Sequence, residues 1–129
     1  MSLEVDSSDA SMIWVVDDNK AVTRALARVL KHAGFDSELF HTGQSALAHP
    51  AAPPPAAAVI DVHLPDLSGL ELAKSLRQRL GNKVPLIIVS GDTSMDNLNA
   101  LRRVGATYFF SKPLRPAQLL EQLRTLGIK

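Results

Sequence analysis

Five times along this chain, a short apolar run is followed by a segment with helical periodicity. This alternation constrains the fold more than any other feature. The first run, MIWVV at Met12–Val16, is continuous and rich in β-branched residues, as expected of a strand buried on both faces. The segment after it places Val22, Leu26 and Leu30 on one helical face and ends at Gly34. Alternating β and α units predict a parallel sheet covered by helices on both faces.

The later units repeat this pattern. Four more strands are expected at 36–41 (DSELFH), 56–61 (AAAVID), 86–90 (LIIVS) and 107–110 (TYFF). Helices are expected at 43–48, around 72–80, from about 98 to 104, and after Pro116, which suits a first helical turn. The segment HPAAPPPAAA, residues 49–58, is interpreted as a surface loop, because consecutive prolines cannot continue a helix.

Bulk properties exclude several classes of protein. A chain of 129 residues suits one domain, which we place at residues 12–127. Residues 1–11 are polar and lack the apolar region of a signal peptide, so we expect a disordered leader or tag remnant. The net charge of +1 argues against nucleic acid or a membrane surface as partner, and no apolar run is long enough to span a bilayer. The absence of cysteine excludes thiolate metal sites and thiol catalysis.

Polar residues follow most of the expected strands. In doubly wound sheets, ligands bind at the carboxyl ends of the strands. The residues at these ends are Asp17 and Asp18 after the first strand, Asp61 at the third, Ser90 at the fourth and Lys112 after the fifth. Three acids, a hydroxyl and a lysine should therefore converge on one edge of the sheet.

The three acids indicate a metal site. Neighbouring carboxylates repel one another, and a hard dication relieves that repulsion. Oxygen ligands without cysteine favour Mg²⁺, which takes one or two protein carboxylates and keeps several waters. The alternative is that Asp17 or Asp18 simply caps the first helix, although this leaves unexplained why two acids face Asp61 from another strand.

Lys112 and Ser90 add groups that suit a phosphoryl ligand. A lysine ammonium balances phosphoryl charge, and a hydroxyl can donate a hydrogen bond to a phosphoryl oxygen. Taken singly, Lys112 reads as a solvated surface lysine and Ser90 as a turn residue. Together with the acids, they indicate phosphoryl transfer in which a carboxylate attacks.

The motifs WVVDDNKAV, VIDVHLPDLSG, IIVSGD and FFSKP, in this order and spacing, resemble the receiver domain of two-component response regulators. The resemblance extends over roughly Met12 to Gly127. It implies a flavodoxin-like α/β fold with five parallel strands in the order 2-1-3-4-5. It also implies that Asp61 accepts a phosphoryl group from a phosphohistidine on a histidine kinase or histidine phosphotransfer protein. Such a module is no conventional enzyme, because it catalyses only its own phosphorylation and dephosphorylation.

The resemblance also assigns the metal and phosphoryl ligands. Mg²⁺, with Mn²⁺ as a substitute, should be held directly by Asp18, largely through water by Asp17, and by Asp61 and the backbone carbonyl of His63. Lys112 should pair with Asp61 and then with the phosphoryl group. The bond between Lys112 and Pro113 is expected to be cis, as in the family.

A switch is implied as well. Ser90 matches the hydroxyl that moves toward the phosphoryl group, and Phe109 matches its aromatic partner, where the family often has tyrosine. Tyr108 should point to the opposite face of its strand. The output surface should be the fourth helix, fifth strand and fifth helix.

Two positions tune phosphoryl lifetime in the family, and here they are His63 and Asp92. We hypothesise that His63 sits at the mouth of the site and controls access of water. The plainer interpretation is an exposed loop histidine.

The implied partners follow from the same resemblance. Besides the phosphodonor, we expect an output domain or protein that the sequence does not identify, and a phosphorylation-dependent homodimer through the output surface is a further candidate. No helix-turn-helix follows Leu126, so no direct contact with nucleic acid is expected, and none with a membrane. A bacterial cytoplasmic location is implied. The chain could be a standalone regulator or a piece of a larger regulator or hybrid kinase.

Two other functions compete with this one. An aspartate-nucleophile phosphatase typically has a second acid two residues after the nucleophile, and here His63 holds that position. A phosphorylation-independent, receiver-like interaction domain usually lacks one of the acids or the lysine, and this chain has them all.

Overall fold

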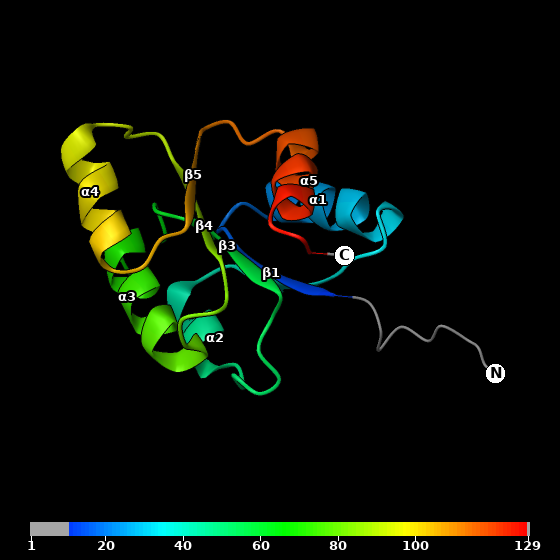
Figure 1. Cartoon of the computed structure of the whole chain (residues 1–129), viewed down its shortest axis with the longest axis horizontal. Helices are drawn as coiled ribbons and strands as arrows, with labels where there is room; N and C mark the ends of the chain where they lie inside the picture. Colours follow the sequence, from blue (N-terminus) through cyan, green and yellow to red (C-terminus); the bar gives the residue numbers. More distant parts are fainter. Residues whose placement is uncertain (1–10, 129) are drawn as a thin grey trace.

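The computed structural model describes residues 11–128 and contains one five-stranded parallel sheet in the order β2-β1-β3-β4-β5 (Figure 1). The strands are β1 (Met12–Val16), β2 (Asp36–Phe40), β3 (Ala57–Asp61), β4 (Leu86–Ser90) and β5 (Tyr108–Ser111). The helices are α1 (Lys20–His32), α2 (Gly43–Ala48), α3 (Gly69–Leu80), α4 (Met95–Arg103) and α5 (Pro116–Thr125). The expected doubly wound fold and strand order are confirmed. The leader predicted at residues 1–11 lies outside the described residues except for Ser11.

The sheet separates two apolar clusters, because successive side chains of a strand point to opposite faces. In β3, Ala58 and Ile60 belong to one cluster, and Ala57 and Val59 belong to the other. The first cluster packs under α2, α3 and α4, and the second packs under α1 and α5 (Figure 1). Every residue of β3 and β4 is buried, which explains why both strands read as continuous apolar runs.

The observed elements lie close to the predicted ranges. The strands predicted at 56–61 and 107–110 are observed at Ala57–Asp61 and Tyr108–Ser111. The fifth strand begins one residue later than predicted, although the Thr107 N–H still donates to the Leu86 carbonyl at 2.8 Å. Along the described part of the chain, no helix has the length and apolar character that crossing a membrane requires.

Arg77 of α3 joins the end of its own helix to the approach to β4 and to a turn that lies 28 residues away in the sequence. Its Nη1 donates to the carbonyls of Gly81 at 2.6 Å and Val84 at 2.8 Å, and its Nη2 donates to the carbonyl of Gly105 at 2.6 Å. Burial lowers the pKa of the guanidinium. Arg77 therefore connects the end of α3, the approach to β4 and the turn between α4 and β5.

We predict that Arg77→Met lowers the free energy of unfolding by about 1–2 kcal/mol, because the part-buried bonds to the Val84 and Gly105 carbonyls lose their charged donor. Urea denaturation measures this change. Lys74→Met, an exposed change on the same helix, is the matched control and should stay within about 0.5 kcal/mol of wild type. Equal stability of the two variants would contradict the assigned role of Arg77.

Candidate functional site

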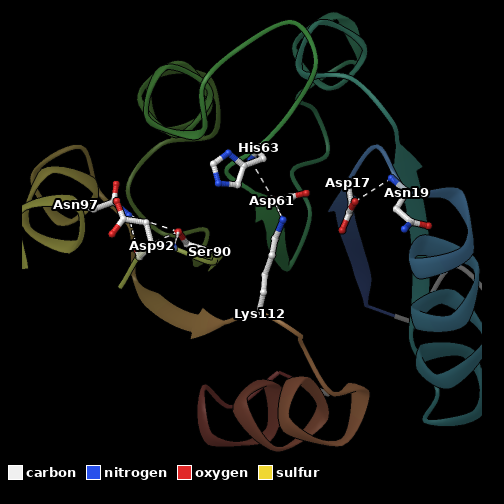
Figure 2. A network of polar contacts seen from close by, with 8 residues as sticks. All are labelled: Asp17, Asn19, Asp61, His63, Ser90, Asp92, Asn97 and Lys112. Atoms are coloured by element: carbon white, nitrogen blue, oxygen red, sulfur yellow. Dashed lines mark hydrogen bonds and ion pairs between the residues drawn. The ribbon is translucent and has the colours of Figure 1, made fainter. Parts of the chain in front are cut away.

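Asp61 ends β3 as a buried carboxylate with a lysine partner. Its side chain is 4% exposed, and the Lys112 Nζ lies 2.7 Å from its Oδ1. The backbone N–H of His63 donates to the same oxygen at 3.0 Å. Figure 2 shows the Lys112 side chain reaching from beyond β5 to Asp61. The ammonium offsets the charge of a carboxylate that burial would otherwise disfavour.

Asp17 and Asp18 face Asp61 from the end of β1. One carboxylate oxygen from each of the three acids lies within 4.8 Å of the others. Asp17 is half-buried and Asp18 is exposed. Burial raises the pKa of Asp17, the N–H of Asn19 opposes that shift, and the charge of Asp61 adds to it. The acids therefore converge at the edge predicted from the strand ends, and without a cation their charges are in conflict.

The alternative that Asp17 or Asp18 caps α1 is wrong. The N-cap is Asn19, whose side-chain oxygen accepts from the Val22 N–H at 3.1 Å. Asp17 instead accepts from the Asn19 N–H at 2.9 Å, and its carboxylate lies beside those of Asp18 and Asp61. Because a third polar residue supplies the cap, both acids remain available to a ligand.

The donor set fits a hard dication. The acids supply carboxylate oxygens, and the chain has no cysteine to favour a softer metal. Asp17, Asp18 and Asp61 could hold Mg²⁺, with the carbonyl of His63 as a further oxygen two residues after Asp61. A cation there would relieve the repulsion that helps raise the pKa of Asp17.

A cavity of about 310 Å³ opens beside the acids. Its polar end is formed by Asp17, Asp18, Asp61 and Lys112. Its apolar end includes Val22 and Leu26 of α1, and Pro113 and Leu114 after β5. The site is therefore accessible from the side of α1 and the segment between β5 and α5.

Ser90 lies at the same edge, but its hydroxyl is engaged elsewhere. Ser90 is 2% exposed, and its O–H donates to the Asp92 carbonyl at 3.1 Å. The Oγ accepts from the Asp92 N–H at 3.0 Å and from the Asn97 amide at 3.5 Å. Figure 2 shows Ser90 beside Asp92 and Asn97 rather than in contact with Asp61. In this conformation the Ser90 hydroxyl makes its hydrogen bonds within the loop between β4 and α4.

The remaining predicted residues surround this centre. His63 and Asp92 are exposed. The Ser94 N–H lowers the pKa of Asp92, and the charge of nearby His63 contributes to the same effect. Phe109 is half-buried against the first apolar cluster, whereas Tyr108 packs edge-on to Phe110 on the other face. The peptide bond between Lys112 and Pro113 is cis.

Sequence reasoning missed Asn97. Its amide donates to the Asp92 carbonyl at 2.7 Å, the shortest contact around Ser90, and so ties the loop after β4 to the first turn of α4. The sequence contains only a weak signal for this role, namely the position of Asn97 three residues after the helix cap Ser94. An asparagine there reads equally well as an exposed helical residue.

We predict that Asp17→Asn stabilises the metal-free protein at pH 7 by on the order of 0.5 kcal/mol, a small value because solvent screens this half-exposed group. The amide keeps an oxygen for the Asn19 N–H but carries no charge. Since the folded-state pKa of Asp17 is raised, the destabilisation by its charge is absent below the ordinary value of 3.8 and complete above the raised value. The gain should therefore disappear on acidification.

Urea denaturation in the presence of a chelator measures this gain. Glu121→Gln, which neutralises an exposed acid on α5, is the control and should change little. A loss of stability in Asp17→Asn at pH 7 would show that the acids do not repel one another.

Comparison with known proteins agrees with this geometry. The chain is 31% identical over 118 residues to the response regulator protein TodT of Pseudomonas putida, covering 92% of this chain and 52% of TodT. It is 37% identical over 114 residues to the response regulator MprA of Mycobacterium avium, covering 88% and 50%. It thus spans about half the length of these curated relatives.

A solved structure supports the same relationship. The CheY-like response regulator receiver domain protein of Methanospirillum hungatei superposes with a TM-score of 0.85 at 28% identity, covering 92% of this chain and 95% of that one. The family profile described as the response regulator receiver domain matches residues 13–124. The chain therefore belongs to the receiver domains of two-component response regulators, which are signalling domains rather than conventional enzymes.

Proposed function

We propose that Asp61 is the phosphoacceptor of a two-component phosphorelay. The observation that carries this proposal is the 2.7 Å pair between Lys112 and Asp61, placed beside the two acids that follow β1. The donor would be a phosphohistidine on a histidine kinase or a histidine phosphotransfer protein. Membership of the family supports this class of partner, and the cavity beside α1 gives such a donor a route to Asp61.

The contacts of Asp61 suggest how the transfer proceeds. Lys112 and the His63 N–H both bind Oδ1 and hold the carboxylate in one orientation. We assign Oδ2 as the nucleophile: a bond forms between Oδ2 and phosphorus while the bond from phosphorus to the histidine nitrogen breaks. Lys112 lies close enough to pair with the transferred group. Mg²⁺ or Mn²⁺, held by Asp17, Asp18, Asp61 and the His63 carbonyl, would neutralise phosphoryl charge.

The new charge would then compete for the hydroxyl of Ser90. To donate to a phosphoryl oxygen, that hydroxyl must leave the Asp92 carbonyl to which it now donates. Phosphorylation would thus bias a loop that Asn97 ties to α4. Phe109, whose ring centroid lies 5.7 Å from the Arg102 guanidinium carbon, connects β5 to α4.

The output surface in this proposal is formed by α4, β5 and α5. It would contact an output domain or protein, or a second phosphorylated copy in a homodimer. No direct contact with nucleic acid or membrane is proposed, and the location is cytoplasmic. His63 and Asp92 would adjust the lifetime of the phosphoryl group.

The phosphoacceptor role predicts a single modification. Wild-type protein incubated with Mg²⁺ and acetyl phosphate should gain one phosphoryl group, detected by mass spectrometry of the intact chain. Asp61→Asn should gain none, and a chelator should abolish the gain in wild type. If wild type stays unmodified both with acetyl phosphate and with phosphorylated histidine kinases, the result would favour the phosphorylation-independent interaction domain.

The proposed role of His63 predicts a change in lifetime. His63→Ala should shorten the phosphoryl half-life by about two- to fivefold, because the ring no longer shields the mouth of the site from water. Loss of the phosphoryl group after removal of the donor measures this half-life. His32→Ala, at the exposed end of α1, is the control. A half-life unchanged in His63→Ala would leave the exposed loop histidine as the correct interpretation.

A further inference from the structure

Asp66, in the loop between β3 and α3, binds the start of a helix that is distant in the sequence. Its Oδ1 accepts from the Gly43 N–H and its Oδ2 from the Gln44 N–H, each at 2.8 Å. These two N–H groups, chiefly that of Gln44, lower the pKa of Asp66 from 3.8, so the carboxylate is charged at neutral pH. The next N–H of α2, that of Ser45, is satisfied by Thr42 at 3.1 Å. Asp66 and Thr42 therefore together accept from the first three N–H groups of α2, which have no partner within the helix.

Leu67 brings the loop into close contact with the same helix. A methyl group added at Gly43 would lie 2.7 Å from the Leu67 Cδ1, which is closer than carbon atoms approach. Gly43 is buried by this contact. The loop is thus held against α2 by a two-armed carboxylate and by tight packing, and both interactions come from consecutive residues.

The other side of this loop carries the groups that face Asp61. An antiparallel bridge between His63 and Ser68 closes it, and the Gly69 N–H donates to the Val62 carbonyl at 3.0 Å. The His63 N–H donates to Asp61. Residues 62–68 also line a hollow together with Asp18. A shift of the loop at Asp66 would therefore move the His63 backbone and the part of the loop that lies beside Asp18.

We propose that Asp66 is a positioning residue: by clamping the loop to the N-terminus of α2, it holds the His63 backbone in place for the metal and for Asp61. This inference rests on the proposed function, because it concerns the carbonyl that would complete the metal site. Asp66 itself contacts neither the metal-binding acids nor Lys112 among the interactions of the described residues. Its effect passes through the loop.

Asp66→Ala tests the proposal by its effect on Mg²⁺ binding, measured by calorimetric titration without a phosphodonor. Affinity should fall about three- to tenfold, less than the about 10- to 100-fold that loss of a direct outer-shell partner causes. Asp66→Asn keeps one carbonyl oxygen for one of the two N–H groups, so its affinity should be intermediate. This second variant also serves if the alanine variant fails to fold.

Thr42→Ala is the matched control, because it removes the other cap of α2 and leaves the loop contact intact. It should lower the midpoint of urea unfolding but change Mg²⁺ affinity less than twofold. Hydrogen exchange at the His63 amide provides a readout without metal: exchange should accelerate in Asp66→Ala and not in Thr42→Ala.

The outcomes separate this proposal from the proposed function. Wild-type affinity in Asp66→Ala, or an equal loss in Asp66→Ala and Thr42→Ala, would overturn the positioning role while leaving the phosphoacceptor role intact. A wild-type protein that bound no Mg²⁺ would overturn the metal-dependent function. The exchange of the His63 amide would then still decide whether Asp66 orders the loop.

Discussion

The ion pair between Asp61 and Lys112 depends on the parallel sheet and in turn organises the site. Asp61 ends β3 and Lys112 follows β5, with β4 between them in the sheet. Only an arrangement that brings all strand ends to one edge lets a lysine reach a buried carboxylate at 2.7 Å across an intervening strand. Removing either partner would leave the other without its counter-charge, so the pair ties the ends of these strands together.

Asp61 and the two acids beside this pair repel one another electrostatically. Burial and the charges of Asp61 and Asp18 raise the pKa of Asp17, and the Asn19 N–H and the charge of Lys112 offset this only in part. Such a conflict persists because the rigid sheet holds the acids in place, with β3 buried along its whole length. Unfavourable clusters of this kind are expected where a protein binds a ligand that relieves them.

Side-chain hydrogen bonds connect two loops at the edge of the sheet to neighbouring helices. The Ser90 hydroxyl is enclosed by Asp92 and Asn97, and the loop that carries His63 is clamped to α2 by Asp66. Each loop is connected to a helix on the side of the first apolar cluster: α4 in one case, α2 in the other. A change of charge at Asp61 would therefore act on loops with defined hydrogen bonds, which must either break or persist.

The sequence by itself determined the alternation of strands and helices and the polar residues at the strand ends, because both follow from local periodicity. Strand order came from the family resemblance, since periodicity does not encode which strands are neighbours. Tertiary structure decided that Asn19 caps α1 and leaves Asp17 to the site. It also decided the contacts of Asp66 and Arg77, whose partners Gly43 and Gly105 lie 23 and 28 residues away. Charged loop and helix residues of this kind read as solvated surface in any local window, and only the packed chain brings distant backbone groups within their reach.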